Sequence, residues 1–227
     1  MYGMYYNLDY LIYILPGFLL ALYAQSKIRA NFDKYSRVTN REGLTGRSVA
    51  EAILKNHGIY DVTIDRVRGS LTDHYDPSHK LLRLSDPVYD STSIAALGIA
   101  AHECGHAIQH HESYAPLSMR NAIVPAANLG SNLSFVFIFI GLFAFQPLLK
   151  LGIALFAITV LFQLLTLPVE YNASHRAKVI LADGILSGEE MVGVERILSA
   201  AALTYVASLL TAIGTLLRFI SLGRRRD

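Results

Sequence analysis

Apolar residues are concentrated in four runs along this chain of 227 residues, and polar residues are concentrated between the first two runs. The runs cover residues 8–24, 129–145, 148–167 and 197–220. Because a helix needs about 20 mainly apolar residues to cross the bilayer core, this pattern predicts about four transmembrane helices. The fourth run is rich in Ala, Ser and Thr, and it could instead be a buried helix, since small residues allow close packing between helices.

The polar part between the first two runs has the shorter patterns of an α+β fold. Thr45 is a plausible N-cap for a short helix, and a second helix is predicted from Ser91 or Ser93 to about His111. Segments rich in apolar and β-branched residues, punctuated by Gly and Pro, predict strands at 62–67, 70–75 and 80–85. We therefore predict a mostly α membrane protein with a small α+β soluble segment.

These patterns divide the chain into three predicted parts. Residues 1–24 form an N-terminal membrane anchor, because no basic region before the apolar run and no small-residue cleavage site after it mark a cleaved signal. Residues 25–128 form the soluble segment, and residues 129–227 form further membrane helices. At the start of the soluble segment, apolar residues at helical spacing predict a helix along the membrane surface: Ile28, Phe32 and Tyr35.

Basic residues flank the first apolar run on one side only. None precedes it, and five follow closely: Lys27, Arg29, Lys34, Arg37 and Arg41. Because basic residues near a span favour the cytoplasmic side, we predict a multi-pass protein of the plasma membrane whose soluble segment faces the cytoplasm. Three basic residues favour the opposite orientation if all four runs cross: Arg224, Arg225 and Arg226.

The composition agrees with a membrane protein and excludes several other classes. Charged residues make up 17% of the chain, against about 25% in typical soluble domains. Residues 121–175 carry only Lys150 and Glu170 as charged side chains. The net charge of +2 and the lack of a basic and aromatic stripe exclude a nucleic-acid partner. The single cysteine, Cys104, excludes an internal disulfide framework.

One motif on the second predicted helix of the soluble segment carries the chemistry. It is His102-Glu103-Cys104-Gly105-His106, an H-E-x-x-H pattern. At 3.6 residues per turn the two histidines lie about 40° apart around the helix, so both imidazoles can bind one zinc ion. Glu103 lies near both histidines without being a ligand, and it can act there as general base on a water molecule activated by zinc. Cys104 points away and is expected in the core.

A catalytic zinc site uses three protein ligands and leaves the fourth position for water. His110 is too far along the helix to reach the same ion, and Glu112 is badly placed, so the third ligand should come from another helix. Glu170 ends the third apolar run, where an unpaired carboxylate at the membrane edge is costly. A His-His-Glu set is a known catalytic arrangement. The alternative is that Glu170 is a surface acid at a helix end.

Three stretches stand out as a set: LTDHYDP at 71–77, the segment 81–110 that contains H-E-x-x-H, and LPVEYNASHRA at 167–177. Together with the order of the predicted parts, they resemble the YugP-type family of membrane-bound zinc metallopeptidases over nearly the whole chain. The resemblance implies a gluzincin-like, zincin-type segment related in plan to the HtpX and CAAX-prenyl-protease group. It implies one zinc ion (Zn²⁺) per chain, with these site residues: ligands His102, His106 and Glu170, and general base Glu103.

The chain departs from the HtpX-like pattern directly after the third ligand. In that group the motif continues to an Ala-Asp pair, whereas here Ala173 is followed by Ser174. A carboxylate that orients a histidine ligand would therefore come from elsewhere, and Asp73 and Asp76 in the stretch 71–77 are candidates. His175 or Arg176, close to Glu170 on the same predicted helix, could stabilise the oxyanion of the tetrahedral intermediate, or could be a cation at the membrane edge.

Two classes of function follow from these residues. The first is a zinc metalloendopeptidase, a hydrolase acting on a membrane-associated polypeptide, which could pair as an extended strand with a free edge of the strand at 80–85. The second is a non-enzymatic membrane protein with a structural or vestigial zinc site, although structural sites are usually closed by four ligands rich in Cys. A transporter is disfavoured, because residues 129–169 hold only Lys150 as an ionisable side chain.

Overall fold

The computed structural model describes residues 2–224, with side chains from residue 11 onward. Contacts between residues divide the chain into two compact units, each made of segments that are distant in sequence. The first unit runs up to Ala24, from Ser118 to Pro168, and from Leu203 onward. The second unit consists of Gln25–Leu117 and Val169–Ala202. Arg225 and Arg226, which bear on the predicted orientation, lie outside the described residues.

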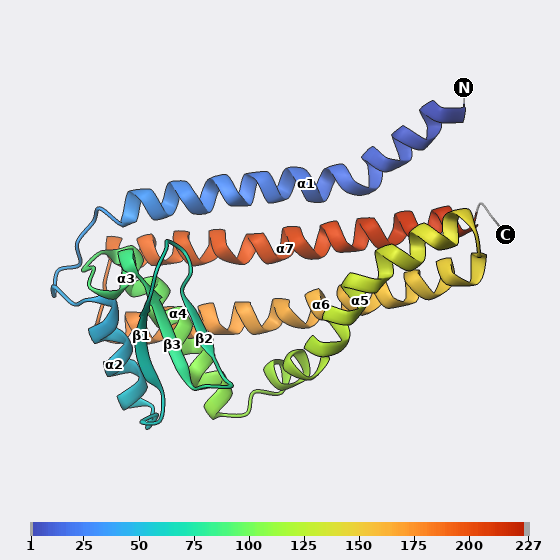
Figure 1. The fold of residues 1–227 in the computed structure, drawn as a ribbon. Helices are drawn as coiled ribbons and strands as arrows, with labels where there is room; N and C mark the ends of the chain where they lie inside the picture. Colours follow the sequence, from blue (N-terminus) through green and yellow to red (C-terminus); the bar gives the residue numbers. More distant parts are fainter. Residues whose placement is uncertain (1, 225–227) are drawn as a thin grey trace. The chain divides into compact units, whose positions relative to one another are not determined.

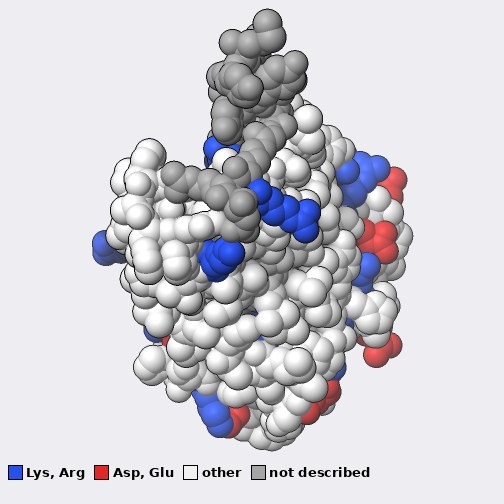
Figure 2. All heavy atoms as spheres, turned by 90° about the vertical axis from the view of Figure 1, so that its right-hand side faces the viewer, with Lys and Arg blue, Asp and Glu red and all other residues white. Residues whose placement is uncertain are grey.

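Four described helices are long and apolar enough to cross a membrane, which confirms the predicted membrane-type fold (Figure 1). They are α1 (Tyr2–Tyr35), α5 (Ala115–Phe143), α6 (Gln146–Ala182) and α7 (Glu189–Arg224). The described side chains of the first unit include no Asp or Glu. Figure 2 shows a face covered mostly by uncharged residues, with the acidic side chains at its right-hand and lower margins. Such surfaces suit lipid, because charged groups are costly inside a bilayer.

Each of these helices is longer than the apolar run that predicted it. α5 begins at Ala115, α6 continues past residue 167 to Ala182, and α7 begins at Glu189. An apolar run marks only the part of a helix that suits lipid. The backbone hydrogen bonds of a helix continue into polar turns, since each further residue adds a bond at little cost.

α1 corrects the prediction of a separate helix along the membrane surface. It continues without a break from the first apolar run to Tyr35. Phe32 and Tyr35 are 9% and 7% exposed, and both belong to the apolar core of the second unit. The apolar stripe after the first run therefore packs against protein rather than against lipid.

The second unit is an α+β assembly around one apolar core. Between α1 and α5 it contains α2 (Gly46–Asn56), β1 (Thr63–Val67), β2 (His74–Asp76), β3 (Leu81–Ser85), α3 (Asp86–Tyr89) and α4 (Ile94–His111). The predicted N-cap at Thr45 is confirmed, and Ser93 rather than Ser91 is the N-cap of α4, because each of the side chains of Thr45 and Ser93 accepts a hydrogen bond from the backbone N–H three residues later. These two caps fix the first residues of α2 and α4.

The three strands form one sheet in the order β1-β3-β2. β1 is parallel to β3, and β2 is antiparallel to β3. β3 is thus the central strand, and Leu82 and Leu84 on it are fully buried. The prediction that strand 80–85 offers a free edge to a substrate is wrong, because both of its edges are already paired. The outer edges of the sheet belong to β1 and β2.

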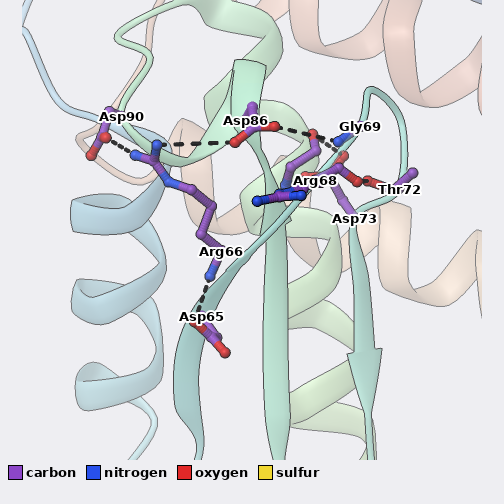
Figure 3. A network of polar contacts seen from close by, with 9 residues as sticks. Asp65, Arg66, Arg68, Gly69, Thr72, Asp73, Asp86 and Asp90 are labelled. Carbon is purple, nitrogen blue, oxygen red and sulfur yellow. Dashed lines mark hydrogen bonds and ion pairs between the residues drawn. The ribbon is translucent and has the colours of Figure 1, made fainter.

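A polar network joins β1, the loop that follows it and α3 (Figure 3). The Arg66 guanidinium pairs with Asp90 and lies 4.0 Å from an oxygen of Asp86. The backbone N–H of Gly69 donates to the Asp86 carboxylate at 3.4 Å, and the Thr72 hydroxyl donates to a carbonyl of the same loop at 3.2 Å. Exposed ion pairs contribute only about 0–1 kcal/mol each to stability, so this network mainly orders the loop that leads to Asp73.

Candidate metal centre

The two histidines of the H-E-x-x-H motif lie one turn apart on α4. Their ring centroids are 4.8 Å apart and the rings are nearly perpendicular, at 86°. The side chains are 14% and 16% exposed, so both are largely enclosed by protein. The other faces of α4 carry small apolar residues, which are buried in the core of the second unit. The helix therefore presents both imidazoles on one side.

Glu170 approaches both histidines from α6. Its Oε2 lies 3.3 Å from Nε2 of His102 and 3.6 Å from Nε2 of His106. The three ligand atoms all lie within 4.8 Å of one another. Because α6 extends well past residue 167, Glu170 stands inside a continuous helix and not at a helix end.

The Oε2 atom of Glu170 is the strongest indication of a metal ion. It is buried and makes no hydrogen bond among the described residues. A buried carboxylate oxygen without a hydrogen bond is costly, and the two Nε2 atoms that face it can each bind a metal ion when the imidazole is neutral. With bonds of about 2.0–2.1 Å, a tetrahedral zinc ion places its ligand atoms about 3.3–3.4 Å apart. The two separations from Glu170, 3.3 and 3.6 Å, lie close to this value.

Gly105 allows α4 and α6 to come close enough for this arrangement. A Cβ atom at this position would lie 2.7 Å from the carbonyl oxygen of Ala173 and 3.1 Å from its Cα atom. These are backbone atoms, so they cannot move aside without shifting α6. Gly105 costs about 1 kcal/mol in helix propensity, and the close approach that it permits brings Glu170 to the histidines.

Replacing Gly105 by Ala should therefore weaken zinc binding even though Ala favours helix formation. The added Cβ forces α4 and α6 apart, and overpacking of this kind costs about 1–3 kcal/mol. Zinc affinity, measured by competition with a chromophoric chelator, should fall. Gly98→Ala on the same helix is the matched control, because its Cβ would meet two side-chain carbons of Val194 at 3.4 and 3.5 Å and the Cα of Val194 at 3.8 Å, all at ordinary contact distance. Equal zinc affinity in both variants would contradict this role of Gly105.

The Nδ1 atoms of the histidines have partners that the sequence did not predict. Nδ1 of His102 lies 3.2 Å from the hydroxyl of Ser174. Nδ1 of His106 lies 3.1 Å from Oε1 of Gln109. Ser174 occupies the position at which the chain departs from the Ala-Asp pattern, so the departure itself was a signal. Gln109 also had a signal, because a polar residue three positions after a histidine on an apolar helix faces the same side.

Glu103 is 8% exposed and lies beside the cluster on α4. Burial raises the pKa of its carboxyl group, the charges of the two histidines lower it, and those of Glu170 and Asp73 raise it further. The net direction is upward. A carboxyl group whose pKa lies above the usual range of glutamate can both take up and release a proton.

Two of the remaining candidates, Asp73 and Arg176, have other partners in the structure. Asp73 accepts hydrogen bonds from the backbone N–H and the hydroxyl of Ser85, at 2.7 and 2.8 Å. His175 is exposed, whereas Arg176 is half-buried and pairs with Glu112 at 2.7 Å. The oxyanion role of His175 or Arg176, and a role for Asp73 near the metal, stay predictions. Cys104 is fully buried in the core, with its Sγ 3.8 Å from a carbonyl oxygen of α2.

Comparisons with known proteins agree with this geometry. A family model described as "Putative neutral zinc metallopeptidase" matches residues 10–224, a range that includes the whole His-His-Glu cluster. The chain is 49% identical over 204 residues to the "Putative membrane protease YugP" of Bacillus subtilis (strain 168). The aligned region covers 88% of this chain and 90% of that protein. No solved structure matches the chain.

Proposed function

This chain belongs to the neutral zinc metallopeptidase family, as its resemblance to the YugP-type family predicted, and we propose that it is a zinc metalloendopeptidase of the membrane. The observation that carries the proposal is the buried Oε2 of Glu170, which makes no hydrogen bond and faces two imidazole nitrogens. In this proposal, His102, His106 and Glu170 hold one zinc ion per chain. The fourth position of the metal is then left for water, as in catalytic sites of this ligand type.

The protein side of the proposed reaction rests on positioning and proton transfer. A bound zinc ion would polarise the carbonyl of a peptide bond and lower the pKa of a water molecule to about 7. Glu103, which is not among the three clustered ligands, would take the proton from the attacking water and deliver it to the leaving amine. Ser174 and Gln109 would hold the two imidazoles in place through their Nδ1 atoms.

A structural zinc site in a non-enzymatic membrane protein is the alternative. Structural sites usually have four protein ligands and are rich in Cys. The single cysteine of the chain is buried in the core beside α2 and away from the cluster, and the metal-type cluster of the described residues has three members. A three-ligand set with a buried carboxylate next to it favours the enzyme.

For the substrate we propose a polypeptide, associated with the membrane, that binds in an extended form. β2 is an outer strand of the sheet, and the Tyr75 hydroxyl on it lies 2.8 Å from Nδ1 of His110 on α4. A free strand edge beside the metal-binding helix can pair with an extended chain through backbone hydrogen bonds. The edge of β2 therefore replaces the edge of strand 80–85 in this proposal.

We further propose that the active site faces the cytoplasm from the plasma membrane. The support is the basic flank of the first apolar run, where Lys27, Arg29 and Lys34 lie in the later turns of α1. Reporter fusions at each end of the chain would test this orientation independently of activity.

Removal and return of the metal tests the proposed activity. Full-length protein purified in detergent should contain about one zinc per chain by mass spectrometry. After a chelator has removed the zinc, hydrolysis of fluorescently labelled casein, an unfolded polypeptide, should stop, and equimolar zinc should restore it. Zinc at one per chain without hydrolysis of any unfolded polypeptide would favour the structural alternative. A protein that binds no zinc would contradict the metal centre itself.

A further inference from the structure

Gln109 is a fully buried polar side chain next to the metal centre. It lies on α4 three residues after His106, and all of its side-chain polar groups have partners. Its Nε2 donates to the carbonyl oxygen of Val169 at 2.8 Å and to Oδ1 of Asn172 at 2.9 Å, both on α6. Its Oε1 lies 3.1 Å from Nδ1 of His106. One amide thus joins a ligand on α4 to the helix that carries Glu170.

These partners fix the orientation of the Gln109 amide. The carbonyl oxygen of Val169 can only accept a hydrogen bond, so the atom facing it must be the NH₂ group. The other end of the amide, which faces His106, must then be the oxygen. Because that oxygen can only accept, Nδ1 of His106 must carry the proton in this contact. Nε2 of a neutral His106 is then left with its lone pair, on the side of Glu170.

The same logic extends through Asn172 to the surface. Nε of Arg176 can only donate, and it lies 2.8 Å from Oδ1 of Asn172, which fixes that amide as well. Oδ1 of Asn172 therefore accepts from both Arg176 and Gln109. The Arg176 guanidinium also pairs with Glu112 at 2.7 Å, where the Glu112 side chain is 48% exposed. Each of these contacts pairs a donor with an acceptor, from the exposed Glu112 carboxylate to His106.

We propose that Gln109 is a positioning residue of the metal centre, which holds His106 with Nδ1 protonated and Nε2 directed at the metal, and that Asn172 and Arg176 hold Gln109 in this orientation. The inference rests on the proposed zinc site. In this inference, Arg176 helps to orient His106 through Asn172 and Gln109. Partners of this kind typically change metal affinity by about 10–100-fold when they are removed.

The test compares zinc affinity in Gln109→Met with that of wild type, in full-length protein and by chelator competition. Met fills a similar volume and makes none of the three hydrogen bonds. We expect zinc affinity to fall by about 10–100-fold and the visible spectrum of the cobalt-substituted protein to change, because the His106 ring is free to turn. Cys104→Ala is the control for a lost buried side chain on α4. It should lower the melting temperature without changing the cobalt spectrum.

Arg176→Met provides a second variant, because the Arg176 side chain is 24% exposed and its replacement is more compatible with folding than that of the fully buried Gln109. Its zinc affinity should fall by a smaller factor than that of Gln109→Met, whereas Lys178→Met on the same helix should match wild type. This inference would be overturned if the zinc affinity and cobalt spectrum of Gln109→Met equalled those of the controls. If Gln109→Met does not fold, the same result in Arg176→Met would overturn it. In either case the proposed zinc site itself would stand. Wild-type protein that binds no zinc would instead remove the proposed site and this inference with it.

Discussion

Glu103→Gln should abolish peptide hydrolysis while the protein keeps about one zinc per chain. Gln has nearly the same shape as Glu, so it fits the same buried position on α4, but its amide cannot take a proton from water. Loss of a general base reduces turnover by about 10²–10⁴-fold. The metal should remain, because the three clustered ligand atoms come from His102, His106 and Glu170. The measurements are casein hydrolysis under single-turnover conditions and zinc content by mass spectrometry.

Glu190→Gln is a matched control for this substitution. Glu190 and Glu103 are both 8% exposed, and both belong to the second unit. The Glu190 carboxylate accepts hydrogen bonds from the backbone N–H groups of Arg41 and Ser187, and a Gln side chain can keep one acceptor there. This variant should hydrolyse casein at the wild-type rate. Undiminished hydrolysis in Glu103→Gln would exclude Glu103 as the base and leave the metal ligands unaffected.

Local signals in the sequence predicted the features that depend on local physics. The predicted N-cap at Thr45 and the predicted helix start at Ser91 or Ser93 were correct, because capping depends on a side chain and a backbone group three residues apart. The spacing of His102 and His106 placed both imidazoles on one helix face, because the helical repeat is fixed. The apolar runs predicted the number of membrane-type helices, because the thickness of the bilayer core sets how many apolar residues a spanning helix needs.

Features that depend on contacts between distant segments were not predictable in this way. Strand 80–85 reads as an ordinary apolar strand, and nothing local shows that β1 pairs with it on one side and β2 on the other. The stripe at Phe32 and Tyr35 has the same pattern whether it faces lipid or a protein core. Ser174 is near His102 only because Gly105 lets α4 and α6 approach, and the contacts of Gln109 with Val169 and Asn172 likewise cross between these two helices.

The position of Glu170 combines both kinds of information. The sequence indicated a role for Glu170 because an unpaired carboxylate at the end of an apolar run is costly in free energy. The structure adds that α6 continues beyond Glu170 as one helix to Ala182. The carboxylate is therefore held by a rigid element instead of a frayed end. A ligand on such a helix needs no ordering when a metal binds, and this reduces the entropy lost on binding. The close contact at Gly105 then sets the distance between the two helices.

Glu170→Ala should remove zinc from the protein more completely than Gln109→Met or Gly105→Ala. Loss of a residue that hydrogen-bonds to a metal ligand lowers metal affinity by about 10–100-fold. Glu170→Ala deletes one of the three ligands themselves, so we expect it to lower zinc affinity by more than this. Zinc at 100 times its dissociation constant stabilises a folded protein by about 2.7 kcal/mol. Wild type should therefore melt at a higher temperature when zinc is added, and Glu170→Ala should not. Glu195→Ala, which removes an exposed carboxylate on α7, should behave as wild type. Zinc retained at one per chain in Glu170→Ala would show that the third ligand is a different residue.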